Sequence, residues 1–298
     1  MPWGSVPGET GGEVPVAPRP SDPAAYLEEL WARLKEPLPP PKGQGIRVGL
    51  DLGTASILLV VLSADGSPLG LARREASVVK DGLVVDYGGA RSICEFLRKD
   101  LEGRLGVSLN RAALAVPPGT SQRDMATHGY VAQAAGLEVD RVFGEPEAAN
   151  HLLGIKDGAL ADLGGGTTGA AAFKDGRPIA SFDEPTGGHH MSLVLAGHMK
   201  IPLERAEAYK LDPKNRREVG PLLAPVLSKM GSILKNGLAG LDLSILWLAG
   251  GSAATPGAGE IIARETGLPV SVAPRPDLVT PAGIAMGCAP FVPEPVSG

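Results

Sequence analysis

The chain has 298 residues, of which 43% are hydrophobic and 20% charged, and its formal net charge is −5 at pH 7. This length suits one large or two modest domains, and the composition excludes a chain that is disordered throughout. The negative charge argues against a broad nucleic-acid surface, which needs clustered Lys and Arg, so we expect no nucleic-acid partner. The longest apolar run, residues 57–62, is far shorter than the ~20 residues of a membrane span, so we expect no membrane insertion.

The two cysteines, Cys94 and Cys288, have no metal-binding or redox spacing around them. The N-terminus lacks the basic, apolar and small-residue order of a secretory signal. These features predict a cytoplasmic protein.

Residues 1–45 are rich in Pro and Gly and form a predicted N-terminal extension. Within it, Ser21 or Asp22 can cap a short amphipathic helix that begins near Pro23, and apolar residues recur at helical spacing from Tyr26 to Leu34. Two alternatives stay open for this helix: it packs back on the main body, or it docks on a partner. A semi-rigid proline-rich spacer follows at residues 37–41.

From Ile46 onward, apolar strands alternate with helical patterns, which indicates an α/β protein with layered sheets. Strands fill most of residues 46–79, with hairpin signals at Gly53-Thr54 and Asp65-Gly66. A helix, a strand, a helix, a strand and a helix follow in "ICEFLRKDLEG", "RAALAVPPG", "SQRDMATHGYVAQAAGL", "VDRVFG" and "PEAANHLLGI". The second half repeats strands, a glycine-rich turn and helices over 158–237. The strand "SILWLAGG", a helix over about 256–267, the short strand "LPVSV" and a closing helix around "VTPAGIAMGCA" follow.

One motif occurs twice, as "VGLDLGTASILLVV" and as "GALADLGGGTTGAAAF". In each copy an apolar strand ends in Asp-Leu-Gly, a Gly/Thr turn follows, and a second apolar strand begins. The repeat predicts two related α/β halves, with lobe I at 46–150 plus 278–290 and lobe II at 151–277.

A Gly/Thr-rich turn exposes backbone amides, so two such turns that face each other form a clamp suited to a polyphosphate. Thr54 and Thr167 add hydroxyl donors. Asp51 and Asp162 could hold a hydrated Mg²⁺, which binds through few carboxylates and keeps most of its waters. The alternative is two ordinary hairpins with tight turns.

"GLDLGT" and "DLGGGT" resemble the two phosphate motifs of the actin-like ATPase superfamily, and "FGEPEAANHLLG" resembles its first connecting motif. "LWLAGGSAATPGAGEII" resembles the adenosine motif, and "TPAGIAMGCA" resembles the second connecting helix. These five motifs occur in the family's order between Ile46 and Ala289. The resemblance implies two ribonuclease-H-like lobes that bind ATP or ADP with Mg²⁺ between them.

The resemblance also implies roles for individual residues. Asp51 and Asp162 would organise Mg²⁺ through water, and Glu145 would orient the attacking water, although a carboxylate at the start of a helix has an ordinary structural reading too. The remaining contacts to the nucleotide would come from Gly53, Thr54, Ala55, Gly164, Gly165, Gly166, Thr167, Gly187, Gly188, Glu207, Lys210, Gly250, Gly251 and Ser252.

The sequence departs from the superfamily in what it lacks. There is no room after Val84, or after Lys210, for the large subdomains that overhang the cleft in relatives, so we expect a minimal two-lobe core. We find no equivalent of the chaperones' catalytic lysine and no peptide-binding domain. The pair His189-His190 with His198 suggests a metal site, but no carboxylate or Cys completes a recognisable spacing, and a role at a helix start is the alternative.

Within the superfamily, "TGGHH" and "AEAYK" resemble a chaperone-like family of ethanolamine-utilisation proteins that is encoded with bacterial microcompartment components. We therefore expect slow ATP hydrolysis that switches the grip on a protein partner, an ethanolamine-utilisation enzyme or a microcompartment protein, with microcompartment association in the cytoplasm. Two rivals stay open: a non-hydrolysing adaptor or scaffold with the same fold, and a small-molecule kinase of the superfamily.

Overall fold

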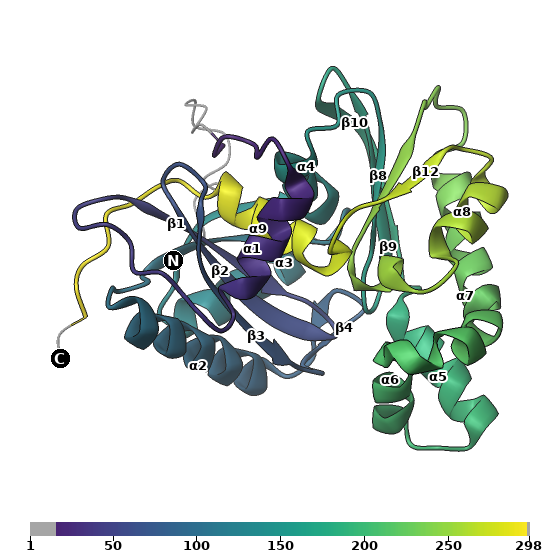
Figure 1. Ribbon diagram of the computed structural model, residues 1–298, viewed down its shortest axis with the longest axis horizontal. Coiled ribbons are helices and arrows are strands. Elements are labelled where there is room, and N and C mark those ends of the chain that lie inside the picture. Colours follow the sequence, from purple (N-terminus) through teal and green to yellow (C-terminus); the bar gives the residue numbers. More distant parts are fainter. Residues whose placement is uncertain (1–15, 297–298) are drawn as a thin grey trace.

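The computed structural model describes residues 16–296, and two five-stranded sheets organise them (Figure 1). The first sheet has the order β3-β2-β1-β6-β7, with β1 antiparallel to β2, β2 antiparallel to β3, and β1, β6 and β7 parallel. Its strands are β1 (Ile46–Leu52), β2 (Ser56–Ser63), β3 (Pro68–Glu75), β6 (Arg111–Val116) and β7 (Glu138–Gly144).

The second sheet repeats this arrangement with the order β10-β9-β8-β11-β12 and the same strand directions. Its strands are β8 (Gly158–Leu163), β9 (Thr168–Lys174), β10 (Arg177–Glu184), β11 (Leu246–Ala249) and β12 (Val270–Val272). The two matching sheets confirm the α/β fold that the repeated Asp-Leu-Gly motif predicts.

Helices cover both sheets, and this explains the continuous apolar runs in the strands, because a strand buried on both faces does not alternate. All eight residues of β2 are buried. On the first sheet lie α2 (Tyr87–Leu105) and α3 (Gln122–Ala134), and on the second lie α7 (Arg216–Gly237) and α8 (Ala258–Thr266). The short helix η1 (Pro213–Asn215) directly precedes α7, and the short helix η2 (Gly251–Ala254) directly follows β11.

Two connecting helices join the sheets and cross each other between them: α4 (Glu145–Leu153) and α9 (Pro276–Gly287). Gly283 lies at the crossing, where a Cβ would overlap the carbonyl oxygen of Ala148. Gly49 of β1 allows a similarly close contact with α9, since a Cβ added there would lie 2.5 Å from the backbone nitrogen of Ala285. Glycine at these two positions lets α9 pack directly on α4 and on β1.

The large overhanging subdomains are absent from the described part of the chain, as the sequence predicts. Between β3 and α2 there is only a small hairpin of β4 (Val79–Lys80) and β5 (Leu83–Val84). On the second lobe, α5 (Gly188–Met199), α6 (Leu203–Leu211) and the first half of α7 share a small core of their own, made by Met191, Leu195, Ala206, Val219 and Leu223. These helices, which the sequence predicts, form only a small unit at the second of these positions.

The N-terminal helix α1 (Pro23–Ala32) packs back on the main body, which decides between the two alternatives that the sequence leaves open. Of the two predicted caps, Ser21 and Asp22, it is Asp22 that caps the helix, by accepting hydrogen bonds from the amides of Ala24 and Ala25. Leu27 and Leu30 are fully buried in a cluster that includes residues of β2, β3 and α9. The early proline-rich stretch up to residue 15 lies outside the described residues.

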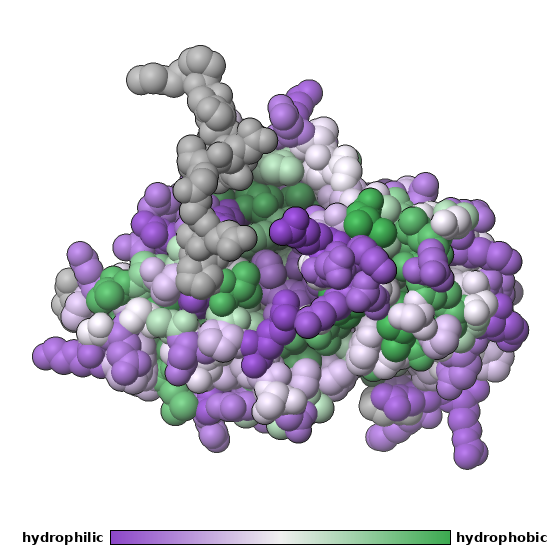
Figure 2. All heavy atoms as spheres, turned by 90° about the horizontal axis from the view of Figure 1, so that it is seen from above, coloured by the Kyte–Doolittle hydropathy of each residue, from purple (hydrophilic) through white to green (hydrophobic). Residues whose placement is uncertain are grey.

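Viewed from above, the surface mixes hydrophilic residues with smaller hydrophobic patches (Figure 2). Among residues 16–296, no helix is long and apolar enough to cross a membrane.

The crossing of α4 and α9 gives a direct test of the fold. We expect Gly283→Ala to lower the free energy of unfolding by about 1–3 kcal/mol, because the added methyl group meets backbone that cannot move aside without separating the helices. Urea unfolding measures this change.

The matched control is Gly103→Ala, also within a helix but with open space around its Cβ, which should raise the free energy of unfolding by up to ~1 kcal/mol. Equal effects of the two substitutions would show that the crossing is not tightly packed.

Candidate functional site

The first glycine turn, residues 53–55, joins β1 to β2. A Cβ on Gly53 would lie 2.8 Å from the carbonyl oxygen of Ser56, so the tight return of the chain requires glycine there. Asp51 sits at the end of β1, opposite Leu58 of β2, and is half-buried.

The second glycine turn, residues 164–167, joins β8 to β9 and is held by its carbonyl groups. The Gly164 oxygen accepts hydrogen bonds from the Gly188 amide at 3.0 Å and from Ser252 Oγ at 2.8 Å. The Gly165 oxygen accepts one from the His189 amide at 2.7 Å. Within the described chain, by contrast, the amides of Gly165 and Gly166 have no hydrogen-bond acceptor. Unpaired backbone amides in a glycine turn are suited to an anion.

The two turns lie against each other. A Cβ on Gly165 would be 3.1 Å from the amide nitrogen of Ala55, and one on Gly166 would be 2.7 Å from Thr54 Oγ1. Thr167 is buried. The structure therefore brings the predicted phosphate residues of the two turns together, in direct contact.

Four carboxylates gather beside the turns: Asp51, Glu145, Asp162 and Asp183. Burial and the neighbouring Asp162 raise the pKa of Asp51 to about 7, and the Arg73 guanidinium partly opposes this. Burial likewise raises the pKa of Asp183 to about 7. Burial, followed by repulsion from the other three carboxylates, raises the pKa of Glu145 well above its usual value. Such a cluster repels itself when ionised, which a bound cation would relieve.

Asp162 is the best anchored of these four groups. It is 6% exposed, and its Oδ2 accepts a hydrogen bond from Thr280 Oγ1 of α9. Burial raises the pKa of Asp162, while this hydrogen bond opposes the rise. A Cβ on Gly250 would overlap Asp162 Oδ1, so the predicted adenosine turn packs directly on this aspartate.

No three His, Cys, Asp or Glu side chains of residues 16–296 come close enough to ligate one metal ion directly. A hydrated ion such as Mg²⁺ keeps most of its own water and needs fewer direct ligands, and Asp51 and Asp162 are the carboxylates that could hold it. His189 and His190 lie at the start of α5, with ring centroids 6.3 Å apart, and the imidazole of His190 accepts a hydrogen bond from the Gly187 amide.

Glu207 and Lys210 of α6 form a polar cluster with Ser192 of α5. The Lys210 side chain is 10% exposed, and its ammonium donates to the Gly188 oxygen at 3.0 Å, to Ser192 Oγ at 2.9 Å and to Glu207 at 2.8 Å. Because the Gly188 amide also binds the Gly164 oxygen, the two helices are tied to the second glycine turn. Gly251 begins η2, next to Ser252.

Asp183 and Thr280 were not among the residues that sequence reasoning selected. Asp183 is the first residue of "DEPTGGHH" and precedes the glycine pair. An acidic residue just before a glycine turn is the signal that could have identified it. Its Oδ1 is buried and has no hydrogen-bond partner in the described chain. Thr280 gives no signal, because only the fold brings α9 to the end of β8.

A cavity of about 190 Å³ adjoins the start of α4, beside Glu145. Gly144, Pro146 and Glu147 line it together with residues 117–120 of the loop after β6 and Ser181 of β10. It therefore lies between elements of both lobes.

Two repeated sheets joined by crossing helices, with paired glycine turns between them, define an actin-like ATPase fold. Solved structures agree: the MreB5 protein of Spiroplasma citri bound to ADP matches with a TM-score of 0.64 over 80% of this chain and 94% of its own, at 18% identity. The PilM-PilN type IV pilus biogenesis complex matches with a TM-score of 0.65 at 14% identity, over 80% of this chain and 97% of that one.

The chain belongs to the EutJ family of ethanolamine-utilisation proteins. It is 39% identical over 241 residues to EutJ of Salmonella typhimurium, covering 78% of this chain and 85% of that protein, and 40% identical over 239 residues to EutJ of Escherichia coli K12, covering 80% and 84%. The crystal structure of EutJ from Carboxydothermus hydrogenoformans has a TM-score of 0.81 and 46% identity, covering 89% of this chain and 97% of that one. No protein-family model matches the sequence.

The raised pKa values predict a pH-dependent stability. Asp51 and Asp183 bind a proton more tightly in the folded than in the unfolded chain, so the free energy of unfolding falls as the pH rises from about 4 to about 7. Asp51→Asn removes one of these charges, and we expect it to raise the free energy of unfolding at pH 8 by on the order of 2 kcal/mol and to change it little at pH 4.

Urea unfolding at both pH values, in buffer with a chelator, checks this expectation. The exposed Asp242→Asn is the control and should behave alike at both pH values. A gain from Asp51→Asn of the same size at pH 4 and pH 8 would contradict the role given to charge repulsion.

Proposed function

We propose that this chain binds ATP or ADP with Mg²⁺ between its two lobes, hydrolyses ATP slowly, and changes its grip on a protein partner with the nucleotide state. The observation that carries the proposal is the unpaired amide pair of Gly165 and Gly166 beside four carboxylates that repel one another. Amides that need an anion next to acids that need a cation match the two halves of a magnesium–polyphosphate ligand.

The neighbouring structures support a nucleotide as that ligand. MreB5 of Spiroplasma citri has this fold and was solved with ADP and with AMPPNP. Gly250 and Ser252 would then face the adenosine, with Glu207 and Lys210 bordering it. Gly187, whose Cβ would meet the Gly165–Gly166 backbone, would support the phosphate turn from behind.

In this proposal the chain contributes positioning and charge. Mg²⁺, when bound, would neutralise phosphate charge. Asp51 and Asp162 would hold its water shell, and Thr280 keeps the Asp162 carboxylate in one orientation. Glu145 would accept a hydrogen bond from the attacking water. A carboxylate with a raised pKa is a better proton acceptor when ionised, which suits this role.

The family relationship supports a partner from ethanolamine utilisation, either an enzyme or a microcompartment protein. The PilM-PilN complex shows that this fold also occurs in a protein assembly. A switch requires contacts that differ between nucleotide states, and the two glycine turns would provide them by parting around the γ-phosphate.

Calorimetric titration of ATP and ADP with Mg²⁺, beside a phosphate-release assay, tests the proposal. We expect Asp162→Asn to weaken binding of both nucleotides at least tenfold, because it removes a charge that the cation requires. Glu145→Gln should keep ATP affinity within a fewfold and reduce phosphate release by about 10²-fold or to background. Asp242→Asn is the control for both readouts.

Binding without release from the unmodified chain would make it a non-hydrolysing adaptor. Release that requires an added metabolite would indicate a small-molecule kinase. Absence of any nucleotide binding would overturn the proposal as a whole.

A further inference from the structure

The chain passes between the two sheets twice within the described residues. It leaves the first sheet through α4 and enters β8 by way of residues 154–157, and it returns from β12 to α9 through residues 273–275. Any movement of one sheet relative to the other must bend the chain at these two crossings.

Residues 17–34, here called the clamp segment, contact both crossings. At the first, Arg19 Nε donates to the carbonyl oxygen of His151 at 3.0 Å, and the Arg19 side chain covers Gly154, whose Cβ would lie 2.8 Å from it. At the second, the Arg275 guanidinium lies 4.0 Å from the centre of the Trp31 ring, a cation–π contact.

Arg275 is an unusual residue on which to place this contact. It has a left-handed backbone, with φ of +42°, directly before α9 begins at Pro276. A non-glycine residue holds this conformation only where its surroundings fix it. Trp31 lies on one side of its guanidinium, and Asp277 lies 3.5 Å from its Nε on another.

The same contacts lead toward the candidate site. Asp277 also pairs with Arg73 of β3 at 3.3 Å, and Arg73 is the cation that opposes the raised pKa of Asp51. The clamp segment is thus connected through Arg275, Asp277 and Arg73 to the aspartate beside the first glycine turn.

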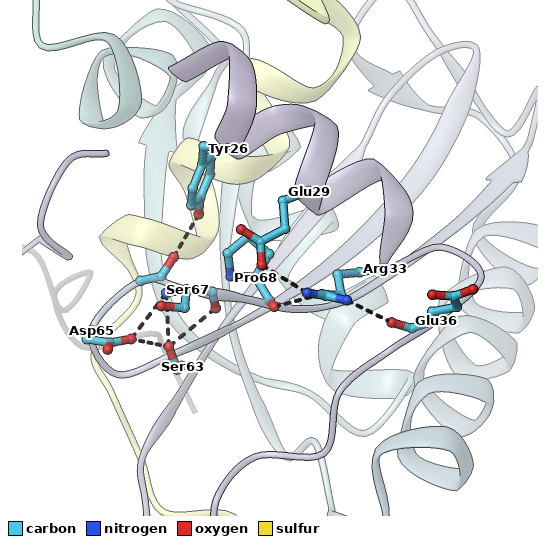
Figure 3. A network of polar contacts seen from close by, with 9 residues as sticks. Tyr26, Glu29, Arg33, Glu36, Ser63, Asp65, Ser67 and Pro68 are labelled. Carbon is cyan, nitrogen blue, oxygen red and sulfur yellow. Dashed lines mark hydrogen bonds and ion pairs between the residues drawn. The ribbon is translucent and has the colours of Figure 1, made fainter. Parts of the chain in front are cut away.

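The rest of the clamp segment is fastened to the first lobe (Figure 3). Tyr26 donates its hydroxyl to the Gly66 oxygen at 2.9 Å, and Arg33 Nε donates to the Pro68 oxygen at 3.2 Å. Near its start, the Ala17 amide binds the Met286 oxygen of α9 at 3.0 Å. Leu27 and Leu30 of α1 are fully buried, and α1 lies across α9 (Figure 1).

We propose that residues 17–34 act as an intramolecular clamp that holds both crossings in one arrangement and so restrains the parting of the two lobes. Release of Trp31 from Arg275 and of Arg19 from His151 would free the lobes to move and allow the glycine turns to separate. The inference concerns the mobility of the chain itself and does not depend on nucleotide binding.

The test measures the distance between the lobes in the full chain without nucleotide. Spin labels at Lys99→Cys on α2 and Lys235→Cys on α7, both exposed positions, report this distance by electron–electron double resonance. The native Cys94 and Cys288 are buried, so the labels attach at the introduced sites. In this background we compare Trp31→Ala, Arg19→Ala and both together.

We expect each single substitution to broaden the distance distribution and the pair to broaden it most. Hydrogen exchange of the amides of Gly154 and Ala273, at the two crossings, should become several-fold faster in the variants whose distance distribution broadens. Trp31→Phe, which keeps an aromatic face for Arg275, should restore the narrow distribution.

The matched control is Phe96→Ala, which also removes a ring from an arginine, with Arg74 4.8 Å from its centre, but lies on α2 away from both crossings. It should leave the distribution and the exchange unchanged. If Trp31→Ala does not fold, Arg19→Ala decides the result. A distribution as narrow in the clamp variants as in the parent, or broadened equally by Phe96→Ala, would overturn the proposal.

Discussion

The close crossing of α4 and α9 is the constraint on which the rest of the molecule depends. Two sheets of the same design can face each other in many ways, and direct backbone contact at Gly283 selects one. It brings the end of β8 to α9, where Thr280 reaches Asp162, and it places the start of α4 beside the same aspartate. In the arrangement that this crossing holds, the two glycine turns lie in contact.

That arrangement concentrates negative charge at a place with little water. Asp51, Glu145, Asp162 and Asp183 come from three strands and one helix, and each makes ionisation of the others harder. Hydrophobic burial elsewhere must outweigh this repulsion in the folded chain. Groups so arranged are typical of sites that bind a compensating charge.

Much of the fold could be predicted from the sequence, because its main signals are local. The Asp-Leu-Gly turns, the apolar strands and the capped helix at Asp22 each depend on neighbours in the chain, and all three have their predicted structures. The pairing of Asp51 with Asp162 followed from the repeat. The helices α5 and α6 were predicted as elements, but the small core that they share with α7 was not, because it joins segments that are distant in the sequence.

Other parts of the candidate site could not be predicted because they depend on contacts between distant segments. Asp183 and Thr280 enter the site through the packing of β10 and α9. The glycine pair that follows Asp183 is its only local signal, and Thr280 has none. The direct contact of the two glycine turns, seen at Gly165 and Ala55, is likewise a property of how the lobes sit together. Sequence motifs indicate which groups meet, and the packing of the helices decides how closely.

The docking of α1 also bears on the order in which the protein is made. Leu27 and Leu30 leave the ribosome before the rest of the described core, yet part of the surface that buries them belongs to α9, which is translated near the end of that core. Until α9 is translated, this apolar face lacks its native contacts with that helix, and long-range contacts of this kind form late. Closure of the core over α1 therefore follows translation of α9, and until then part of the apolar face of α1 stays uncovered.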